Sequence, residues 1–76
     1  MKQLYVLREV LTDYTSGMVV IIATDVNECR NIFAEKFSYR DELLDEFEDS
    51  ILKHCEVIPV SENEVSRIVS YVFGGA

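Results

Sequence analysis

Residues 4–23 read LYVLREVLTDYTSGMVVIIA, and the rest of the architecture is built on this stretch. Its first part, 4–11, is rich in residues that favour β-strands, and 18–23 is an apolar run short enough for a buried strand. Between them, 12–17 (TDYTSG) supplies turn residues and a glycine that can adopt positive φ. The stretch therefore predicts a β-hairpin. Its second strand is expected to be central, because 18–23 has no polar side chains to place in water.

The hairpin is followed by the start signal of a helix. Thr24 and Asp25 offer oxygens that can cap a helix, and Glu28 stands three residues after Asp25, as in a capping box. Apolar residues then recur at steps of three and four, which places them on one helical face that we expect to pack on the hairpin. These residues are Val26, Cys29, Ile32, Phe33 and Phe37.

A second helix is predicted from Ser38 to near Lys53, with Ser38 as its cap. Acidic residues lie in its first turns, where the helix dipole favours negative charge. At about 100° per residue, Leu43, Leu44, Phe47 and Ile51 fall within one arc of this helix. The opposite arc carries six carboxylates: Asp41, Glu42, Asp45, Glu46, Glu48 and Asp49.

The last third of the chain predicts one more strand and one more helix. Residues 55–60 (CEVIPV) are typical of a strand, and Pro59 places it at a sheet edge because proline cannot donate to a ladder. Ser61 and Glu64 form a capping-box pattern before an apolar stripe of helical spacing at 65–73. A strand is the alternative for this last segment, because IVSYVF is dense in β-branched and aromatic residues.

The expected fold is therefore a single α+β domain covering residues 1–76, with the element order β-β-α-α-β-α. Its sheet would have three largely antiparallel strands, with the helices packed on one face. Any apolar residues left on the other face are the expected contacts of a homodimer.

Charge narrows the classes of partner. The chain has 14 acidic and 7 basic residues, and the whole excess of negative charge lies in 25–76. A phosphate backbone would be repelled by such a surface, which argues against direct nucleic-acid binding and favours a basic protein partner.

The sequence also predicts a compartment. Cys29 and Cys55 do not make a disulfide framework, and the N-terminal residues lack a signal-peptide pattern. The longest uncharged stretch, 14–24, is far shorter than the roughly 20 apolar residues that span a bilayer. We therefore expect a cytoplasmic protein with free thiols and no membrane partner.

Catalysis and metal binding find little support in the sequence. His54 and Cys55 are neighbours in extended chain, so their side chains point to opposite sides and cannot form a nucleophile–base pair. The chain holds three Cys and His residues, fewer than a structural zinc site needs. It has no glycine-rich phosphate motif. The sequence predicts a protein that is not an enzyme and binds no metal and no cofactor.

The six carboxylates of 41–49 are the candidate partner-binding residues. Three like-charged pairs lie four residues apart, such as Asp41 and Asp45, and each destabilises a helix slightly, by about 0.2–0.5 kcal/mol. Solubility alone does not require that arrangement, although a purely solvated face is the alternative interpretation. Tyr14 joins the candidate set, because a core role is hard to arrange for a tyrosine in the predicted hairpin turn.

Short length, acidic balance, the β-β-α opening and the DELLDEFED helix (residues 41–49) together resemble the small acidic proteins with which bacteriophages block host defence nucleases, the anti-CRISPR class. The resemblance implies a phage-encoded inhibitor in the host cytoplasm that binds a nuclease or its nucleic-acid-binding complex. A weaker resemblance, to ubiquitin-like modifiers, lies in the N-terminal hairpin followed by a helix and in Gly74-Gly75. The second acidic helix and the terminal Ala76 depart from it.

Two function hypotheses follow. The first is a non-enzymatic protein-binding module, an acidic inhibitor that docks on a basic, nucleic-acid-binding surface. The alternative is a structural or regulatory homodimer whose exposed apolar sheet surface mediates assembly, with the acidic helix only solvated.

Overall fold

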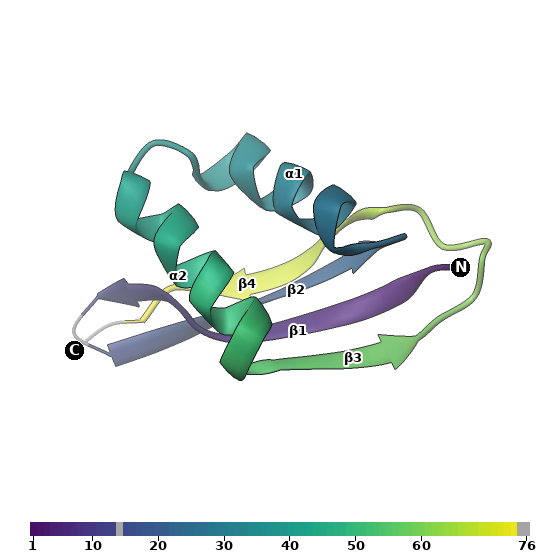
Figure 1. Cartoon of the computed structure of the whole chain (residues 1–76), viewed down its shortest axis with the longest axis horizontal. Helices are drawn as coiled ribbons and strands as arrows, with labels where there is room; N and C mark the ends of the chain where they lie inside the picture. The colour runs from purple at the N-terminus through teal and green to yellow at the C-terminus, as the bar shows by residue number, and fades with distance from the viewer. Residues whose placement is uncertain (14, 75–76) are drawn as a thin grey trace.

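The N-terminal hairpin forms the centre of the fold (Figure 1). A computed structural model describes residues 1–13 and 15–74. Strand β1 (Gln3–Asp13) pairs antiparallel with β2 (Thr15–Ala23), from Gln3 opposite Ala23 to Asp13 opposite Thr15. The predicted hairpin is confirmed, but its strands are longer than expected. Residues 12, 13 and 15–17 belong to the strands, and Tyr14 lies outside the described residues.

Strand β1 contains two irregularities in its pairing with β2. The register shifts between Arg8 and Val10 and again between Val10 and Asp13. Glu9 and Leu11 adopt the left-handed conformation, with φ of 62° and 52°. These β-bulges bend the strand, and they let the sequence neighbours Val10 and Leu11 both be fully buried.

Helix α1 (Val26–Phe37) begins as the sequence predicts. The Asp25 carboxylate accepts a hydrogen bond from the Glu28 backbone N–H at 2.8 Å, and the Glu28 carboxylate accepts one from the Thr24 N–H at 2.7 Å. This is a reciprocal capping box. The predicted apolar face is also confirmed, since Cys29, Phe33 and Phe37 are buried and Val26 and Ile32 pack against the core.

Helix α2 (Asp41–Lys53) starts later than expected. Ser38 is the C-cap of α1, and Arg40 is the N-cap of α2 and provides no side-chain hydrogen bond. The predicted Ser38 cap was therefore wrong, because the turn between the helices uses residues 38–40. The apolar arc is confirmed: Leu43 and Phe47 are fully buried, and Leu44 and Ile51 are partly buried.

The last segment is a strand. Strand β3 (Cys55–Pro59) lies at a sheet edge, as predicted, but residues 67–72 form strand β4 (Arg67–Val72) and the predicted third helix was wrong. Ser61 caps a turn instead, accepting a hydrogen bond from the Asn63 N–H at 3.1 Å. β4 pairs antiparallel with β2, with Met18 opposite Val72. The element order is thus β-β-α-α-β-β.

The result is an α+β fold with two layers (Figure 1). The four-stranded antiparallel sheet has the order β3-β1-β2-β4, and both helices lie on the same face of it. Helix α1 packs over β2 and β4, and α2 packs over β1 and β3. Three phenyl rings fill the space between the layers. The ring centroid of Phe33 lies 4.9 Å from that of Phe37 and 4.9 Å from that of Phe47.

Candidate functional site

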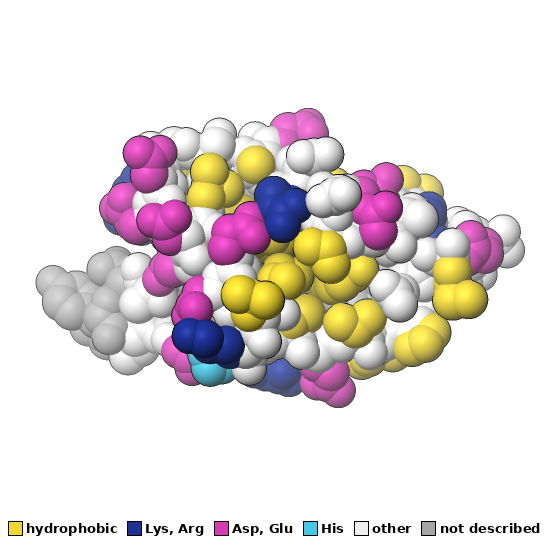
Figure 2. All heavy atoms as spheres, viewed as in Figure 1, with side chains coloured by type: hydrophobic (Ala, Val, Ile, Leu, Met, Phe, Trp, Pro, Cys, Tyr) yellow, Lys and Arg dark blue, Asp and Glu magenta, His cyan; other side chains and the backbone are white. Residues whose placement is uncertain are grey.

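Five of the six predicted carboxylates are exposed on α2, and Glu46 is half-buried. Over this helix Figure 2 shows acidic side chains with basic side chains among them. Three of the six form ion pairs within the chain. Glu48 accepts from Arg30 of α1 at 2.5 and 3.0 Å. Asp49 contacts Lys53 at 3.2 Å, and Glu42 contacts Arg40 at 3.7 Å.

The remaining carboxylates differ in their surroundings. Glu46 is half-buried and accepts a hydrogen bond from the Thr12 N–H at 3.3 Å, so it holds β1 against α2. Asp41 and Asp45 are exposed and have no ion pair or hydrogen bond to another residue of 1–13 or 15–74. Hydrogen bonding to Arg30 also lowers the pKa of the Glu48 carboxyl. The negative charge of α2 is therefore partly neutralised by Arg30, Arg40 and Lys53.

A different surface lies on the sheet face that the helices leave open. Tyr5, Leu7, Val19 and Ile21 point into the helical layer, so the residues that alternate with them point away from it. The register of β3 and β4 extends this second face across all four strands. We name it the uncovered face, and its apolar residues are Leu4, Val6, Met18, Val20, Ile22, Ile58 and Val72.

The uncovered face is apolar at its centre and polar at its edges. On the central strands Leu4, Val6 and Val20 are half-buried, Met18 is 36% exposed and Ile22 is 3% exposed. On the edge strands Ile58 and Val72 are 40% and 59% exposed. At one edge Arg8 of β1 contacts Glu56 of β3 at 3.3 Å. At the other edge, Arg67 and Ser70 of β4 lie opposite Ile22 and Val20. An apolar centre with a polar rim is the usual composition of a protein–protein contact surface.

The cysteines and histidine do not form a reactive site. Cys29 is a buried residue of α1, and this burial raises the pKa of its thiol to about 12. Burial also raises the pKa of the Cys55 thiol. Both sulfurs are therefore protonated at neutral pH, whereas a nucleophilic cysteine needs a lowered thiol pKa. His54 is exposed and ends α2, and its backbone carbonyl accepts from the Arg8 N–H at 3.2 Å.

Metal ligation and membrane crossing are two further possibilities for the described part of the chain. Within residues 1–13 and 15–74, no three His, Cys, Asp or Glu side chains are grouped so that they could hold a metal ion. Neither helix there has the length and apolar content needed to cross a membrane.

Sequence reasoning missed Ser50, the one buried polar side chain among the described residues. Its hydroxyl donates to the Arg8 carbonyl at 2.6 Å, which ties α2 to the bulged part of β1. The signal was present, because Ser50 lies three residues after Phe47 on the apolar side of the helix. Tyr14, the seventh candidate residue, lies outside the described residues.

The geometry thus offers two candidate surfaces, the acidic side of α2 and the uncovered face of the sheet. Comparisons with the models of known protein families, with curated protein sequences and with solved structures found no match for the chain. The resemblance to phage-encoded inhibitors therefore stays a prediction, and the function is argued from these surfaces alone.

Proposed function

We propose that this chain is a non-enzymatic protein-binding module that forms a homodimer through the uncovered face of its sheet. The observation that carries the proposal is that all four strands present apolar side chains on the face opposite the helices. An antiparallel sheet with one face in water normally alternates apolar and polar residues. In β2 the half-buried Val20 stands where water would favour a polar residue, and Ile22 on the same face is only 3% exposed.

The size of the face fits a dimer. The Cα atoms extend over 37 × 20 × 19 Å. One broad side is therefore on the order of 700 Å², close to the roughly 800 Å² that each partner buries in an interface of standard size. Two sheets packed face to face would give each protomer a second core layer, which stabilises a small domain.

Charge supports one arrangement of the two copies. Glu56 lies on the edge strand β3 and Arg67 on the opposite edge strand β4. A two-fold axis parallel to the strands places β3 of one copy opposite β4 of the other, and so brings Glu56 near Arg67 of the second copy. A two-fold axis perpendicular to the strands would instead place β3 opposite β3 of the second copy, and so bring Glu56 towards Glu56 of that copy. Glu56 also pairs with Arg8, and Arg67 with Glu64, within the chain. The first arrangement adds a complementary contact to these pairs, and the second brings two carboxylates together.

Sedimentation of the purified protein tests the proposal. The wild type should sediment at twice its mass of 8.7 kDa. Val20→Lys, at the centre of the uncovered face, should sediment as a folded monomer with unchanged circular dichroism. Leu52→Lys is the matched control, because Leu52 is 81% exposed on α2 and lies outside the face, and it should remain a dimer. A monomeric wild type at about 100 µM, or a dimeric Val20→Lys, would refute the proposal.

A second candidate function is an acidic inhibitor that docks through α2 on a basic, nucleic-acid-binding protein surface. It is favoured by Asp41 and Asp45, which stay exposed and unpaired one helical turn apart, in a chain of net charge −7. Because five of the seven Lys and Arg residues already pair with acids, these two aspartates carry much of the remaining field on α2.

The test of this second function is a pull-down with wild type and with the double variant Asp41→Lys/Asp45→Lys. A nucleic-acid-binding protein should be retained by the wild type, lost from the double variant, and displaced by added duplex DNA or by salt. The control is Glu9→Lys/Glu62→Lys, which makes the same change of net charge on exposed residues outside α2. Equal retention by the two double variants would exclude α2 as the binding face.

A further inference from the structure

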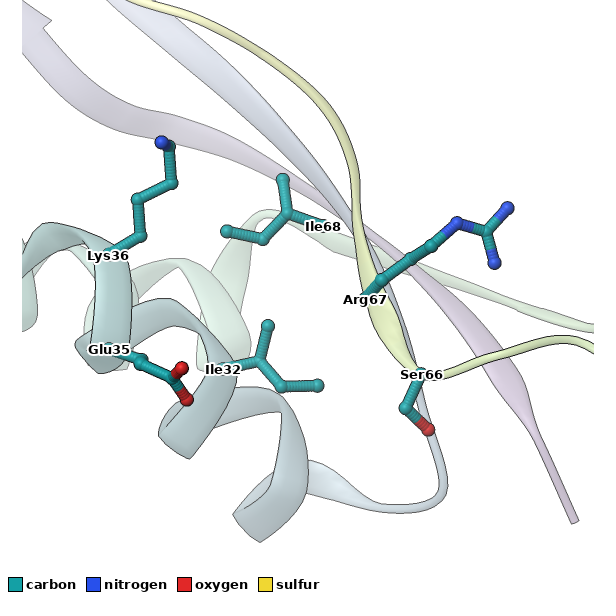
Figure 3. A pocket seen from close by; sticks show the side chains of 6 residues that line it. All are labelled: Ile32, Glu35, Lys36, Ser66, Arg67 and Ile68. Carbon is teal, nitrogen blue, oxygen red and sulfur yellow. The ribbon is translucent and has the colours of Figure 1, made fainter.

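The outer edge of β4 forms one wall of a groove whose other wall is α1. Two neighbouring hollows of about 450 Å³ each lie along it and share Lys36 and Ile68. Figure 3 shows Ile32 of α1 and Ile68 of β4 facing one another across the first hollow, while Arg67 points away from it. Tyr71 and Val69 continue the β4 wall in the second hollow and are 41% and 46% exposed. The groove thus runs beside an edge strand and is lined by apolar and polar side chains, with Glu35 and Lys36 of α1 among them.

This edge strand has hydrogen-bonding groups to offer. Among the described residues, β4 pairs only with β2, so the backbone groups on its other side have no strand partner. An exposed edge of this kind is a template for an added strand. A bulge at Val69, between Ser70 and Ile68, interrupts the ladder with β2. Such bulges hinder unselective pairing, so the side chains in the groove must provide much of the selectivity.

Three charged side chains line the first hollow, Glu35, Lys36 and Arg67, and Arg67 pairs with Glu64. Five of the seven Lys and Arg residues form ion pairs within the chain, and Lys2 donates to the Glu64 carbonyl. Of the seven Lys and Arg residues, all of which the structure describes, only Lys36 has neither an ion pair nor a hydrogen bond to another described residue, although the chain has twice as many acids as bases. Its ammonium lies 5.1 Å from the Tyr71 ring centroid and 5.9 Å from that of Phe37. An unpaired cation, held by two rings beside an open strand edge, is suited to a carboxylate.

We propose that this groove binds an extended peptide segment of a partner protein, which adds to β4 as an antiparallel strand. The spacing fits, because Ile32 and Lys36 are one helical turn apart, about 6 Å, and residues two apart in a strand are about 6.8 Å apart. One side chain of the segment enters between Ile32 and Ile68, and a second, two positions away, reaches Lys36.

The direction of the segment sets the order of these two side chains. Ile32 and Ile68 lie together in the first hollow, and Lys36 and Tyr71 line the second, so α1 and β4 run the same way along the groove. An antiparallel segment passes Lys36 first and Ile32 afterwards. The recognised pattern is therefore an acidic residue, any residue, and then a β-branched apolar residue. The groove is on the helical side of β4, so its occupation does not depend on the proposed dimer.

The probe is the synthetic peptide Thr-Glu-Thr-Val-Thr-Thr, blocked at both ends and titrated into the ¹⁵N-labelled full chain. The amide signals of residues 66–72 and 32–37 should shift, while those of Val6 and Val20 on the uncovered face should not. Replacing the glutamate of the peptide by glutamine should weaken binding by a factor of roughly 1.4 to 5, the range of one exposed ion pair. The reversed order, Thr-Val-Thr-Glu-Thr-Thr, should bind as weakly as the glutamine peptide or more weakly.

The protein variants isolate the role of Lys36. Lys36→Met keeps the aliphatic stem over Tyr71 and removes the charge. It should weaken binding of the glutamate peptide by the same factor of roughly 1.4 to 5 and leave binding of the glutamine peptide unchanged. Lys53→Met changes the net charge equally, far from the groove, and should bind as the wild type does.

Three results would overturn the proposal. These are equal affinity of Lys36→Met and the wild type for the glutamate peptide, shifts confined to α2 or to the uncovered face, and no shifts up to several millimolar peptide. Amides of β4 that are protected from exchange in a concentration-dependent way without peptide would assign the edge to a second copy instead.

Discussion

The two faces of the sheet are made of chemically similar residues and have different surroundings. In β2 the run Val19, Val20, Ile21 and Ile22 alternates between them. Val19 and Ile21 lie under the helices among aromatic rings, whereas Val20 and Ile22 point to the uncovered face, where Val20 is half-buried and Ile22 is 3% exposed. A strand that is apolar on both sides needs cover on both sides. Two helices supply one cover, and we infer that a second copy of the chain supplies the other.

The largest expected effect belongs to the covered face. Phe33→Ala removes the ring that contacts both Phe37 and Phe47, and should lower the free energy of unfolding by about 3–5 kcal/mol. Since small domains are stable by roughly 5–15 kcal/mol, much of the total is lost. Urea denaturation followed by circular dichroism measures it. Tyr39→Ala, at a residue that is 66% exposed, is the control and should change little. A loss below about 1 kcal/mol would show that the covered face is not the main core.

An intermediate effect compares the faces directly through two substitutions of equal shape. Val19→Thr places a hydroxyl under the helices and should destabilise the fold by about 1–3 kcal/mol. Val20→Thr places the same hydroxyl on the uncovered face and should change monomer stability by less than about 0.5 kcal/mol.

The matched pair is measured by urea denaturation at two protein concentrations, because dimerisation makes the unfolding midpoint depend on concentration. Val19→Thr should keep that dependence, and Val20→Thr should reduce it. Equal losses of stability for both, at every concentration, would mean that the two faces are equivalent.

The smallest effect concerns the hydrogen bonds of Glu28, which connect α1 to the segment just before β4. The Glu28 carboxylate accepts from the Thr24 N–H and from the Ser66 hydroxyl just before β4, and these bonds lower the pKa of its carboxyl. A carboxyl with a lowered pKa in the folded state stabilises the fold above its ordinary pKa, and this contribution is lost as the pH falls through the lowered value.

Melting temperatures of the wild type and Glu28→Ala should therefore differ at about pH 6 and converge towards about pH 3. Glu35→Ala, an exposed residue of the same helix, is the control and should show no such convergence. A difference that is independent of pH would mean that the contribution of Glu28 does not depend on its charge.

Local signals in the sequence predicted the elements whose start depends on neighbouring residues. Asp25 and Glu28 form the capping box of α1 as their spacing indicates, and Pro59 lies in an edge strand. The prediction of a helix at 65–73 was wrong, because the apolar spacing of these residues suits both a helix and a strand. Pairing with the open edge of β2 decides in favour of the strand, and the paired residues lie from 45 (Ile22 and Arg67) to 54 (Met18 and Val72) positions apart, beyond the reach of local periodicity.

The same distinction explains the candidate site. Helical spacing placed six carboxylates on one side of α2, and five of them are exposed, whereas Glu46 is half-buried and accepts a hydrogen bond from the Thr12 N–H. The pairing of Glu48 with Arg30 depends on how α1 and α2 pack, so it could not be predicted from one helix. The groove of Lys36 was missed for the same reason, since its two walls meet only after β4 has joined the sheet.

The position of β4 in the chain has a consequence for synthesis. Its partner β2 is made some 45 residues earlier, and α1, α2 and β3 are complete before residues 67–72 leave the ribosome. Until then the apolar run 18–23 has an edge without a neighbour, and such edges favour aggregation. A nascent chain at this stage is a natural client for a chaperone, and one that stops before residue 67 would remain so.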